Sequence, residues 1–434
     1  MNETTIGIIG IIALFVMLAM RIPVGIVMMI IGAVGVGVLN GWSAALATLG
    51  SEPFVIASNF ELMIIPLFVL MGNLAGISGM SRDLYGAAYA WLGQFRGGLA
   101  SATIAACAGF AALSGSSVAS AVTMGRVSLP EMKRYNYDDR LATGCVAAGG
   151  TLGILIPPST GFVIYAILTE ESIGRLFLAG ILPGLLLTFL FIVAIMIQTR
   201  INKDLGPPGP KLPLAEKFRA TAKAGAMIGI VFVTIGGIYS GFFTAGEAAG
   251  VGAFLAFVLA VVRRAVNIDS MTSTLLQTVR TTAFAFLILI GAHVFNPFLA
   301  LTQIPTDLAA LLTGTDLSPH AILLILLAAF IVLGTFLEGF AILVLTLPIV
   351  HPLIVELGFD PIWFGVVMVI VLEMGLISPP VGVNVFVVKG IAEDVPMKQI
   401  FIGILPFWFA MGVCLAIIII FPQIALYLPN TMIN

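Results

Sequence analysis

The sequence predicts an all-α polytopic membrane protein made of two halves in inverted repeat, with about ten transmembrane helices and two re-entrant helical hairpins. Three observations predict this fold. The chain is 60% hydrophobic and only 9% charged, far from the composition of soluble proteins. Two apolar segments are interrupted by Pro-Pro pairs, and each pair follows a small polar segment at nearly the same distance upstream. The basic residues are also distributed as expected for one orientation in a membrane.

Apolar stretches long enough to cross a bilayer recur along the chain. In the first half the predicted spans are 4–20, 23–39, 54–77, 141–168 and 174–198, with a hairpin at 97–125. In the second half they are 224–243, 246–262, 281–302, 361–388 and 400–420, with a hairpin at 319–352. The spans that contain the Pro-Pro pairs are predicted to be broken helices, because proline removes a backbone donor and disrupts the turn before it.

The positions of the basic residues set the predicted topology. If the amino terminus lies outside, every Lys and Arg except Arg175 falls on the inner side. This bias collapses if either hairpin is counted as a full crossing. Because each half has an odd number of crossings, the second half enters the membrane from the opposite side, which is an inverted-topology repeat. Both termini are therefore predicted to lie outside.

Two segments outside the spans have distinct patterns. Residues 80–96 place Met80, Leu84, Trp91 and other apolar side chains at helical spacing, which predicts an amphipathic helix in the membrane interface. Such a helix is either an arm that supports a moving part or an ordinary loop helix. Residues 199–223 combine Gly and Pro with basic residues and predict a connector between the halves on the inner side.

A ligand site is predicted where the first polar segment meets the first break. Ser114 to Ser117 form a small polar hairpin tip at membrane depth, and the break lies within residues 151–160. Hydroxyls and freed carbonyls are hard oxygen ligands suited to an alkali cation, and helix amino termini favour an anion. The alternative is that small residues only allow close helix packing. The recurrence of the pattern in the second half favours a site.

The second half repeats this pattern with different side chains: Thr335, Glu338 and Gly339 at the tip, and Gly375, Ser378, Gly382 and Asn384 at the break. The amide of Asn384 has donors and acceptors and could bridge ion and substrate, with a packing role as the alternative. Three carboxylates lie in apolar stretches, at Glu61, Glu338 and Glu373. Each is a functional hypothesis, against the alternative of a neutral, hydrogen-bonded structural glutamate.

At these motifs the chain resembles the large membrane subunit of a tripartite ATP-independent periplasmic (TRAP) transporter, DctM-type. The resemblance rests on Gly150-Thr151-Leu152-Gly153 with Ile156-Pro157-Pro158-Ser159, on Glu373-Met374-Gly375 with Ser378-Pro379-Pro380-Val381-Gly382-Val383-Asn384, on Ser114-Gly115-Ser116-Ser117 and on Arg21-Ile22-Pro23-Val24. It covers essentially the whole chain, although many members have Thr where Ser378 stands.

The resemblance implies an elevator mechanism, in which a transport core of the two hairpins and two broken helices slides against a scaffold. The implied division is scaffold 1–80, arm 80–96, core 97–168, scaffold or connecting helix 174–198, connector 199–223, scaffold 224–302, core 319–390 and a last helix at 400–420. The expected sodium ligands are Ser114, Gly115, Ser116, Ser117, Gly153, Pro157, Thr335, Gly339, Gly375 and Gly382. The expected substrate contacts are Ser116, Ser117, Thr151, Pro158, Ser159, Thr160, Glu338 and Asn384.

The resemblance also implies partners and a location. A small four-helix membrane subunit on a separate chain is expected, because its helices are not seen at the amino terminus of this chain. A periplasmic substrate-binding protein would deliver an organic acid such as a C4-dicarboxylate, sialic acid, keto acid or sulfonate. The chain would lie in the bilayer of the bacterial inner membrane with both termini periplasmic. Sodium is the expected coupling ion, and neither a cofactor nor a nucleic-acid partner is expected.

Two other functions compete with this one. The nearest is a stand-alone sodium- or proton-coupled organic anion transporter that needs no binding protein. A more distant one is an intramembrane serine hydrolase, with Ser114 as nucleophile and His293 as base. The recurrence of the break in both halves explains Ser114 without catalysis. The chain has no phosphate-binding glycine loop ending in Lys-Ser/Thr, so ATP-driven transport is unsupported.

Overall fold

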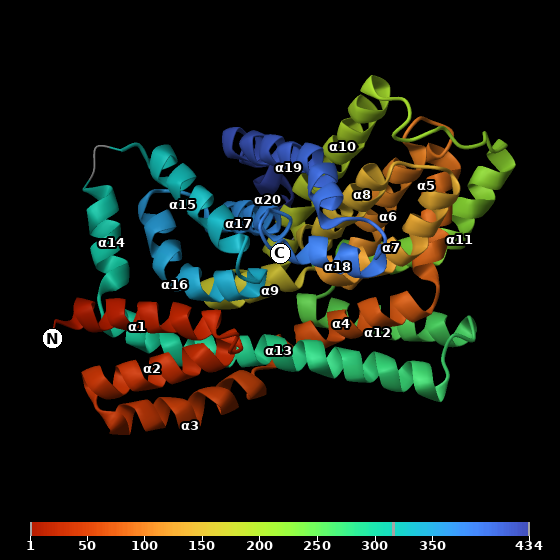
Figure 1. The fold of residues 1–434 in the computed structure, drawn as a ribbon. Coiled ribbons are helices and arrows are strands. Elements are labelled where there is room, and N and C mark those ends of the chain that lie inside the picture. Colours follow the sequence, from red (N-terminus) through yellow and green to blue (C-terminus); the bar gives the residue numbers. More distant parts are fainter. Residues whose placement is uncertain (1, 315–316, 433–434) are drawn as a thin grey trace.

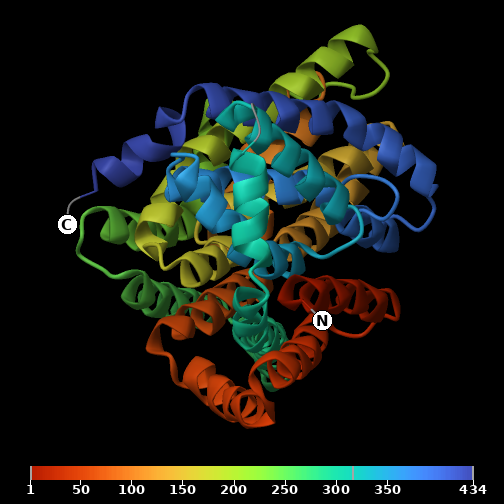
Figure 2. The ribbon, with the colours of Figure 1, turned by 90° about the vertical axis from the view of Figure 1, so that its left-hand side faces the viewer.

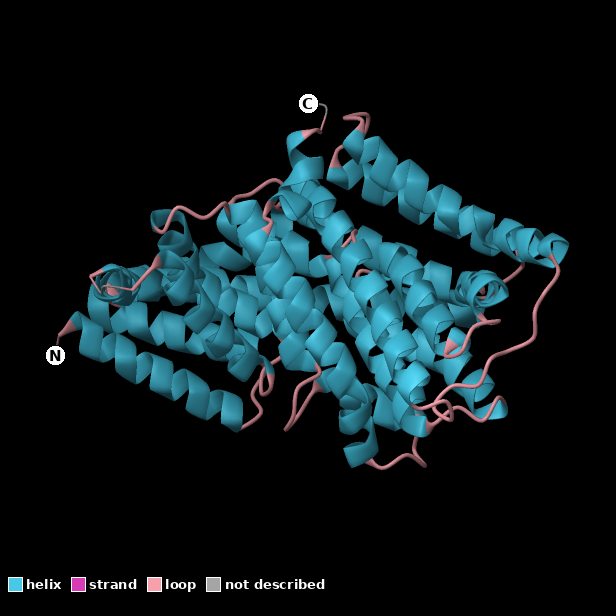
Figure 3. Cartoon of the chain, turned by 90° about the horizontal axis from the view of Figure 1, so that it is seen from above, coloured by secondary structure: helices cyan, strands magenta, loops and turns pink. Residues whose placement is uncertain are grey.

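The computed structural model describes residues 2–314 and 317–432, which form helices and no strand (Figures 1 and 3). Eight segments of this part are long and apolar enough to cross a membrane: Phe60–Ile77, Asp139–Thr169, Ile173–Ile201, Leu214–Tyr239, Ala245–Val262, Ile268–Leu301, Gly339–Glu356 and Met397–Ile420. Shorter apolar helices, including Val24–Asn40 and Pro361–Leu376, lie between them. The predicted all-α polytopic class is confirmed.

The first half contains ten helices and one 3-10 turn. They are α1 (Glu3–Ala19), α2 (Val24–Asn40), α3 (Trp42–Ser58), η1 (Phe60–Met63), α4 (Ile64–Ile77), α5 (Met80–Leu92), α6 (Gly98–Ser114), α7 (Ser117–Arg134), α8 (Asp139–Leu155), α9 (Thr160–Thr169) and α10 (Ile173–Ile201). Helices α6 and α7 pack together as the first hairpin, and α8 and α9 are the two parts of the first broken helix.

The second half has the same order of hairpin, broken helix and long helix. Its helices are α11 (Leu214–Tyr239), α12 (Ala245–Val262), α13 (Ile268–Leu301), α14 (Ile304–Thr313), α15 (Pro319–Gly334), α16 (Gly339–Glu356), α17 (Pro361–Leu376), α18 (Val383–Ile391), α19 (Met397–Ile420) and α20 (Gln423–Asn430). Helices α15 and α16 form the second hairpin, α17 and α18 are the second broken helix, and α14 occupies the position that α5 has in the first half.

The span predicted at 54–77 begins later than predicted: the candidate membrane span is Phe60–Ile77, and residues 54–58 are the end of α3. Helix α3 continues through Pro53 to Ser58, and the chain then starts again as η1 and α4. The side chain of Asn59 accepts a hydrogen bond from the backbone N–H of Glu61 at 2.9 Å, and this cap begins the new helical segment. Helices α14 and α20 were also not predicted, because each is short and follows directly on a long apolar helix.

The helices are arranged in two groups (Figures 1 and 2). In one group α13 runs along α2, α3 and α4, and α12 packs on α4. In the other group α8 is surrounded by α6, α7 and α19, and α17 packs against α15, α16, α10 and α19. Helix α10 packs on α19 and α20 at the end of the chain, and also on α6, α8 and α17 of the first hairpin and the broken helices.

Helix α5 lies between these groups. One face packs on α6 of the first hairpin and the other on α11. Asp83 accepts a hydrogen bond from Arg263, just after α12, at 2.5 Å, and the indole N–H of Trp91 donates to Thr221 of α11 at 2.9 Å. These contacts fasten α5 to second-half helices while it supports the hairpin.

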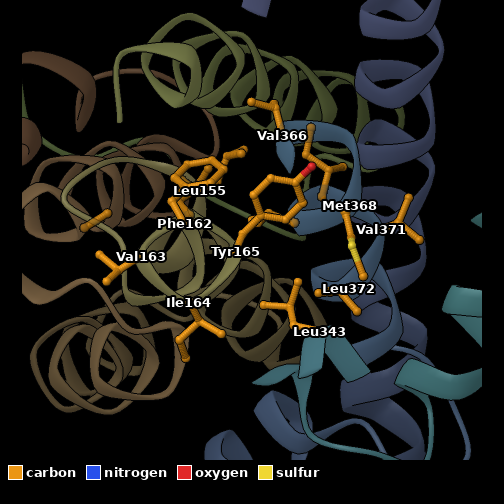
Figure 4. Packing of buried hydrophobic residues seen from close by; sticks show 14 of the residues in the cluster. Leu155, Phe162, Val163, Ile164, Tyr165, Leu343, Val366, Met368, Val371 and Leu372 are labelled. Carbon is orange, nitrogen blue, oxygen red and sulfur yellow. The ribbon is translucent and has the colours of Figure 1, made fainter. Parts of the chain in front are cut away.

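Helix α17 is the most enclosed element, with every residue from Ile362 to Leu376 buried. Figure 4 shows how side chains of α9, α16 and α17 pack together around Tyr165. The hydroxyl of Tyr165 donates to the backbone carbonyl of Pro361 at 2.6 Å. The broken helix of the first half is thereby joined to the start of the broken helix of the second.

The first broken helix begins at a charged cap outside the membrane span. The side chain of Asp138 accepts from the backbone N–H of Arg140 at 2.9 Å. Hydrogen bonds from the Arg140 guanidinium hold the pKa of the Asp138 carboxyl below its usual value. The cap therefore stays ionised at neutral pH, and its negative charge suits the amino terminus of α8.

Candidate functional site

The tip of the first hairpin meets the break of the first broken helix. Gly115 ends α6 with φ +60°, and Ser116 caps α7 by accepting from a backbone N–H of its first turn. The carbonyl of Gly115 accepts two hydrogen bonds from Thr160, from the hydroxyl at 2.8 Å and from the backbone N–H at 3.3 Å. A Cβ at Gly115 would lie 2.9 Å from the carbonyl oxygen of Pro158. The predicted contact between tip and break is present.

The polar side chains of this first tip and break already have partners within the protein. The hydroxyls of Ser114 and Ser120 lie 2.7 Å apart, and the hydroxyl of Thr151 donates to a carbonyl of its own helix at 2.6 Å. Ser159 caps α9. Gly153 approaches the tip so closely that a Cβ at this position would lie 2.4 Å from the carbonyl oxygen of Ser116. This region is a closed, hydrogen-bonded joint.

The tip of the second hairpin also meets its own break. Gly334 and Gly375 are in backbone contact, and a Cβ on Gly375 would lie 2.5 Å from the Cα of Gly334. Thr335 donates to a carbonyl of its own helix at 2.7 Å. The Ser378 hydroxyl donates to a carbonyl of α17 at 2.6 Å and accepts from the indole N–H of Trp408 at 2.9 Å.

The two breaks differ in exposure. Pro157 and Pro158 of the first break are buried, whereas Pro379 and Pro380 of the second are exposed. Gly382, with φ +62°, turns the chain into α18. The backbone around the second break is therefore accessible from outside the bundle, which the backbone around the first is not.

Three side chains around the second tip and break carry buried polar atoms without a hydrogen-bond partner among the described residues. They are Oε2 of Glu338, Oε2 of Glu373, and both amide atoms of Asn384. Glu373 is 2% exposed and Asn384 is 0% exposed. Glu338 directly precedes Gly339, the first residue of α16. Buried polar groups are rarely left unpaired, so these atoms mark a place that is suited to a polar ligand.

Glu373 connects the two halves. The hydroxyl of Ser117, at the tip of the first hairpin, and the carboxylate of Glu338, at the tip of the second, are the neighbours that act on it electrostatically. Helix α18 packs on α7, and α9 packs on α16, so each broken helix also touches the hairpin of the other half. The predicted pairing within each half is present, and this crossing between halves is added to it.

Other predicted features lie away from this point. Glu61 is exposed, in η1. His293 faces Glu52 at 3.6 Å, and the Ser114 hydroxyl pairs with Ser120, so the serine–histidine contact that a hydrolase needs is not made. In the described residues no group of three His, Cys, Asp or Glu side chains is placed to hold a metal ion.

The chain was compared with known proteins. Residues 11–424 match the family model described as the DctM component of the tripartite ATP-independent periplasmic transporter. The C4-dicarboxylate TRAP transporter large permease protein DctM of Pseudomonas aeruginosa is 38% identical over 384 residues, covering 88% of this chain and 89% of that protein. The sialic acid TRAP transporter large permease protein SiaM of Vibrio cholerae is 34% identical, covering 87% and 88%.

A fused relative and a solved structure extend the comparison. The isethionate TRAP transporter permease protein DctMQ of Oleidesulfovibrio alaskensis is 33% identical, and the match covers 91% of this chain but 63% of that protein. The crystal structure of the Alcanivorax borkumensis YdaH transporter matches with a TM-score of 0.61 at 16% identity, covering 89% and 90% of the two chains. That likeness concerns the fold. The family model and the relatives show that this multi-pass membrane protein belongs to the DctM family, the large permease component of TRAP transporters.

Proposed function

We propose that this chain is the subunit that moves a small organic acid, together with sodium, across the bacterial inner membrane. The cargo lies between the tips of the two hairpins and the second break, beside Ser117, Glu373 and Asn384. The observation that carries this proposal is the group of unpartnered polar atoms on Glu338, Glu373 and Asn384. Their burial is costly unless a ligand satisfies them.

The charges around these atoms favour cotransport with a cation. Glu338 and Glu373 place two carboxyl groups beside the proposed cargo. When ionised they repel an organic anion, so an anionic substrate beside them needs a bound sodium ion or a proton there. The oxygens of Ser117, Glu373 and Asn384 are hard ligands suited to sodium. The Asn384 amide N–H₂ and the amino terminus of α18 would then bind the substrate carboxylate.

The relatives support an organic acid as the substrate class, because their names specify C4-dicarboxylates, sialic acid and isethionate. A periplasmic binding protein would deliver it. A small membrane subunit would be the second partner of this chain. The group containing α13 and α12 would be the scaffold, and the hairpins with the broken helices would slide against it as an elevator, with both termini periplasmic.

Reconstitution tests the proposal. The chain is placed in proteoliposomes with or without the small subunit and binding protein encoded beside it, and with or without an inward sodium gradient. Labelled candidate acids are supplied, and uptake is expected only when both partners and the gradient are present.

Each arm of this experiment separates one alternative. Full-rate uptake without the binding protein would identify a stand-alone transporter and contradict the tripartite proposal. Undiminished uptake in sodium-free buffer with an inward proton gradient would contradict sodium coupling. Empty liposomes and liposomes with the partners alone are the controls for leakage and for binding.

A further inference from the structure

A pocket at the end of α10 has the form of a lipid-binding site. It has a volume of about 410 Å³ and lies where the end of α5, the start of α6 and the end of α10 come together. Its lining residues are Leu92, Phe95, Arg96, Ser101, Ile192, Met196, Thr199, Arg200 and Lys203. It is separate from the tips and breaks that hold the proposed cargo.

The rim of the pocket is basic. Arg96, Arg200 and Lys203 are all exposed, and none forms an ion pair with a carboxylate of the described chain. No carboxylate lines the pocket. Three cations around one hollow repel each other unless an anion lies between them. An anionic group is therefore the complementary ligand for the rim.

The floor of the pocket is apolar. Leu92, Phe95, Ile192 and Met196 line it, and Phe95 and Met196 are each 57% exposed. A free phosphate or carboxylate would neutralise the rim and leave this surface uncovered. A hydrocarbon chain would cover it, and removal of apolar surface from water is favourable. The occupant must therefore be both anionic and apolar.

We propose that this pocket binds an anionic phospholipid of the surrounding bilayer. Its phosphodiester lies among Arg96, Arg200 and Lys203, and an acyl chain lies along Leu92 and Met196. Basic pockets between transmembrane helices at one membrane surface are recognised sites for such head groups. The chain is thereby bound to particular lipids, beyond the sodium, acid and protein partners proposed above.

The position of the pocket gives the lipid a mechanical role. Helix α5 is fastened to α11 and to Arg263 after α12, whereas α6 belongs to the first hairpin, which would move. The bound lipid bridges the arm and this hairpin. Anionic lipid content is therefore expected to change the transport rate.

The test measures lipid retention by native mass spectrometry of the purified full chain. Phosphatidylglycerol is the probe, with phosphatidylcholine as the neutral comparison. The variant Arg96→Gln/Arg200→Gln/Lys203→Gln should retain phosphatidylglycerol at least roughly tenfold more weakly, because each basic residue near an anionic lipid contributes to binding. The matched control Lys211→Gln/Arg219→Gln/Lys223→Gln removes the same charge from exposed positions outside the pocket and should retain it as the unaltered chain does.

Three results would overturn the proposal. One is an equal loss of phosphatidylglycerol retention in the matched control variant, which would mean that the lipid is attracted by surface charge in general and not by this pocket. Another is equal retention of phosphatidylglycerol and phosphatidylcholine. The third is that glycerophosphoglycerol, which is the head group without acyl chains, competes for the pocket as strongly as the intact lipid does. That result would mean that the pocket binds free anions. If the triple variant does not fold, Lys203→Gln alone must lower retention by a smaller factor, and unchanged retention would count against the site.

Discussion

The first and second hairpin–break regions have the same order of elements but opposite states of hydrogen bonding. In the first, Ser114 pairs with Ser120, and Thr160 binds the carbonyl of Gly115. In the second, Glu373 and Asn384 are buried with unpartnered atoms. The difference teaches that recurrence of a motif does not imply recurrence of its role. Apart from Ser117, which lies beside the proposed cargo, the first region is a joint whose polar groups pair within the protein, and the second region presents polar groups that need a ligand.

The substitution Asn384→Leu is the strongest test of this difference between the two regions. Loss of both amide atoms should lower uptake by roughly tenfold to a hundredfold, since ligand hydrogen bonds to buried groups are strong. The same change should leave thermal stability equal or higher, because it removes two buried unpartnered atoms, each costing about 1–3 kcal/mol. Uptake by proteoliposomes and thermal unfolding in detergent measure the two effects.

The experiment is informative because uptake is expected to fall while thermal stability is expected to stay equal or rise. An active Asn384→Leu chain would show that the amide is not part of the cargo site. A chain that loses activity and stability together would show that Asn384 has a structural role, and the contrast between the two regions would then be lost.

The second test disrupts the contact between tip and break in the first region. In Gly115→Ala the new Cβ meets the carbonyl of Pro158 at 2.9 Å in a backbone with φ +60°, so the tip must move away from the break. Strain of this kind costs of order 1–3 kcal/mol, and both unfolding temperature and uptake should fall.

A matched control separates the clash from the backbone strain. Gly79 has φ +77°, but a Cβ there would meet nothing within 4 Å. Gly79→Ala should therefore show only the smaller cost of a left-handed non-glycine residue. Equal losses in the two variants would mean that contact between tip and break contributes nothing.

The smallest expected effect is that of Thr160→Val. It removes the 2.8 Å hydrogen bond to the carbonyl of Gly115 and keeps the side-chain shape. The loss should be about 1 kcal/mol, seen as a small drop in unfolding temperature. Thr151→Val, which removes a bond within its own helix, is the comparison. If uptake in Thr160→Val fell as far as in Asn384→Leu, the joint between Gly115 and Thr160 would have to be counted as part of the cargo site together with Ser117.

Much of the fold could be predicted from the sequence, because apolar length, Pro-Pro pairs and small polar tips are local signals. The two helix pairs and the two interruptions at the Pro-Pro pairs lie near the predicted positions, although α7 continues to Arg134, beyond the predicted end at residue 125. The division between α3 and α4 was missed, because Pro53 suggests a helix start and the cap at Asn59 lies inside an apolar run. Such caps depend on one side chain and are hard to distinguish from the surrounding pattern.

The candidate site was only partly predictable. The residues of each tip and break were identified, but their state of hydrogen bonding depends on residues from other elements. Ser120 follows the first tip by one helical turn and could have been included on that spacing. Trp408, which donates to Ser378 from a distant helix, has no local signal. The approach of Ser117 to Glu373 joins the two halves and follows only from tertiary packing.

The complete burial of α17 has a consequence for how the protein is made. The helix is enclosed by α10, which is synthesised before it, and by α19, which is synthesised after it. Until α19 leaves the ribosome, the side of α17 that packs on α19 lacks its protein neighbours, among them the Ile418 carbonyl that accepts from the indole N–H of Trp363 at 3.0 Å. An unpaired polar group facing lipid is unfavourable, so the nascent chain should hold this helix loosely until α19 has packed on it. The order of synthesis thereby makes the enclosure of α17 a late step of assembly.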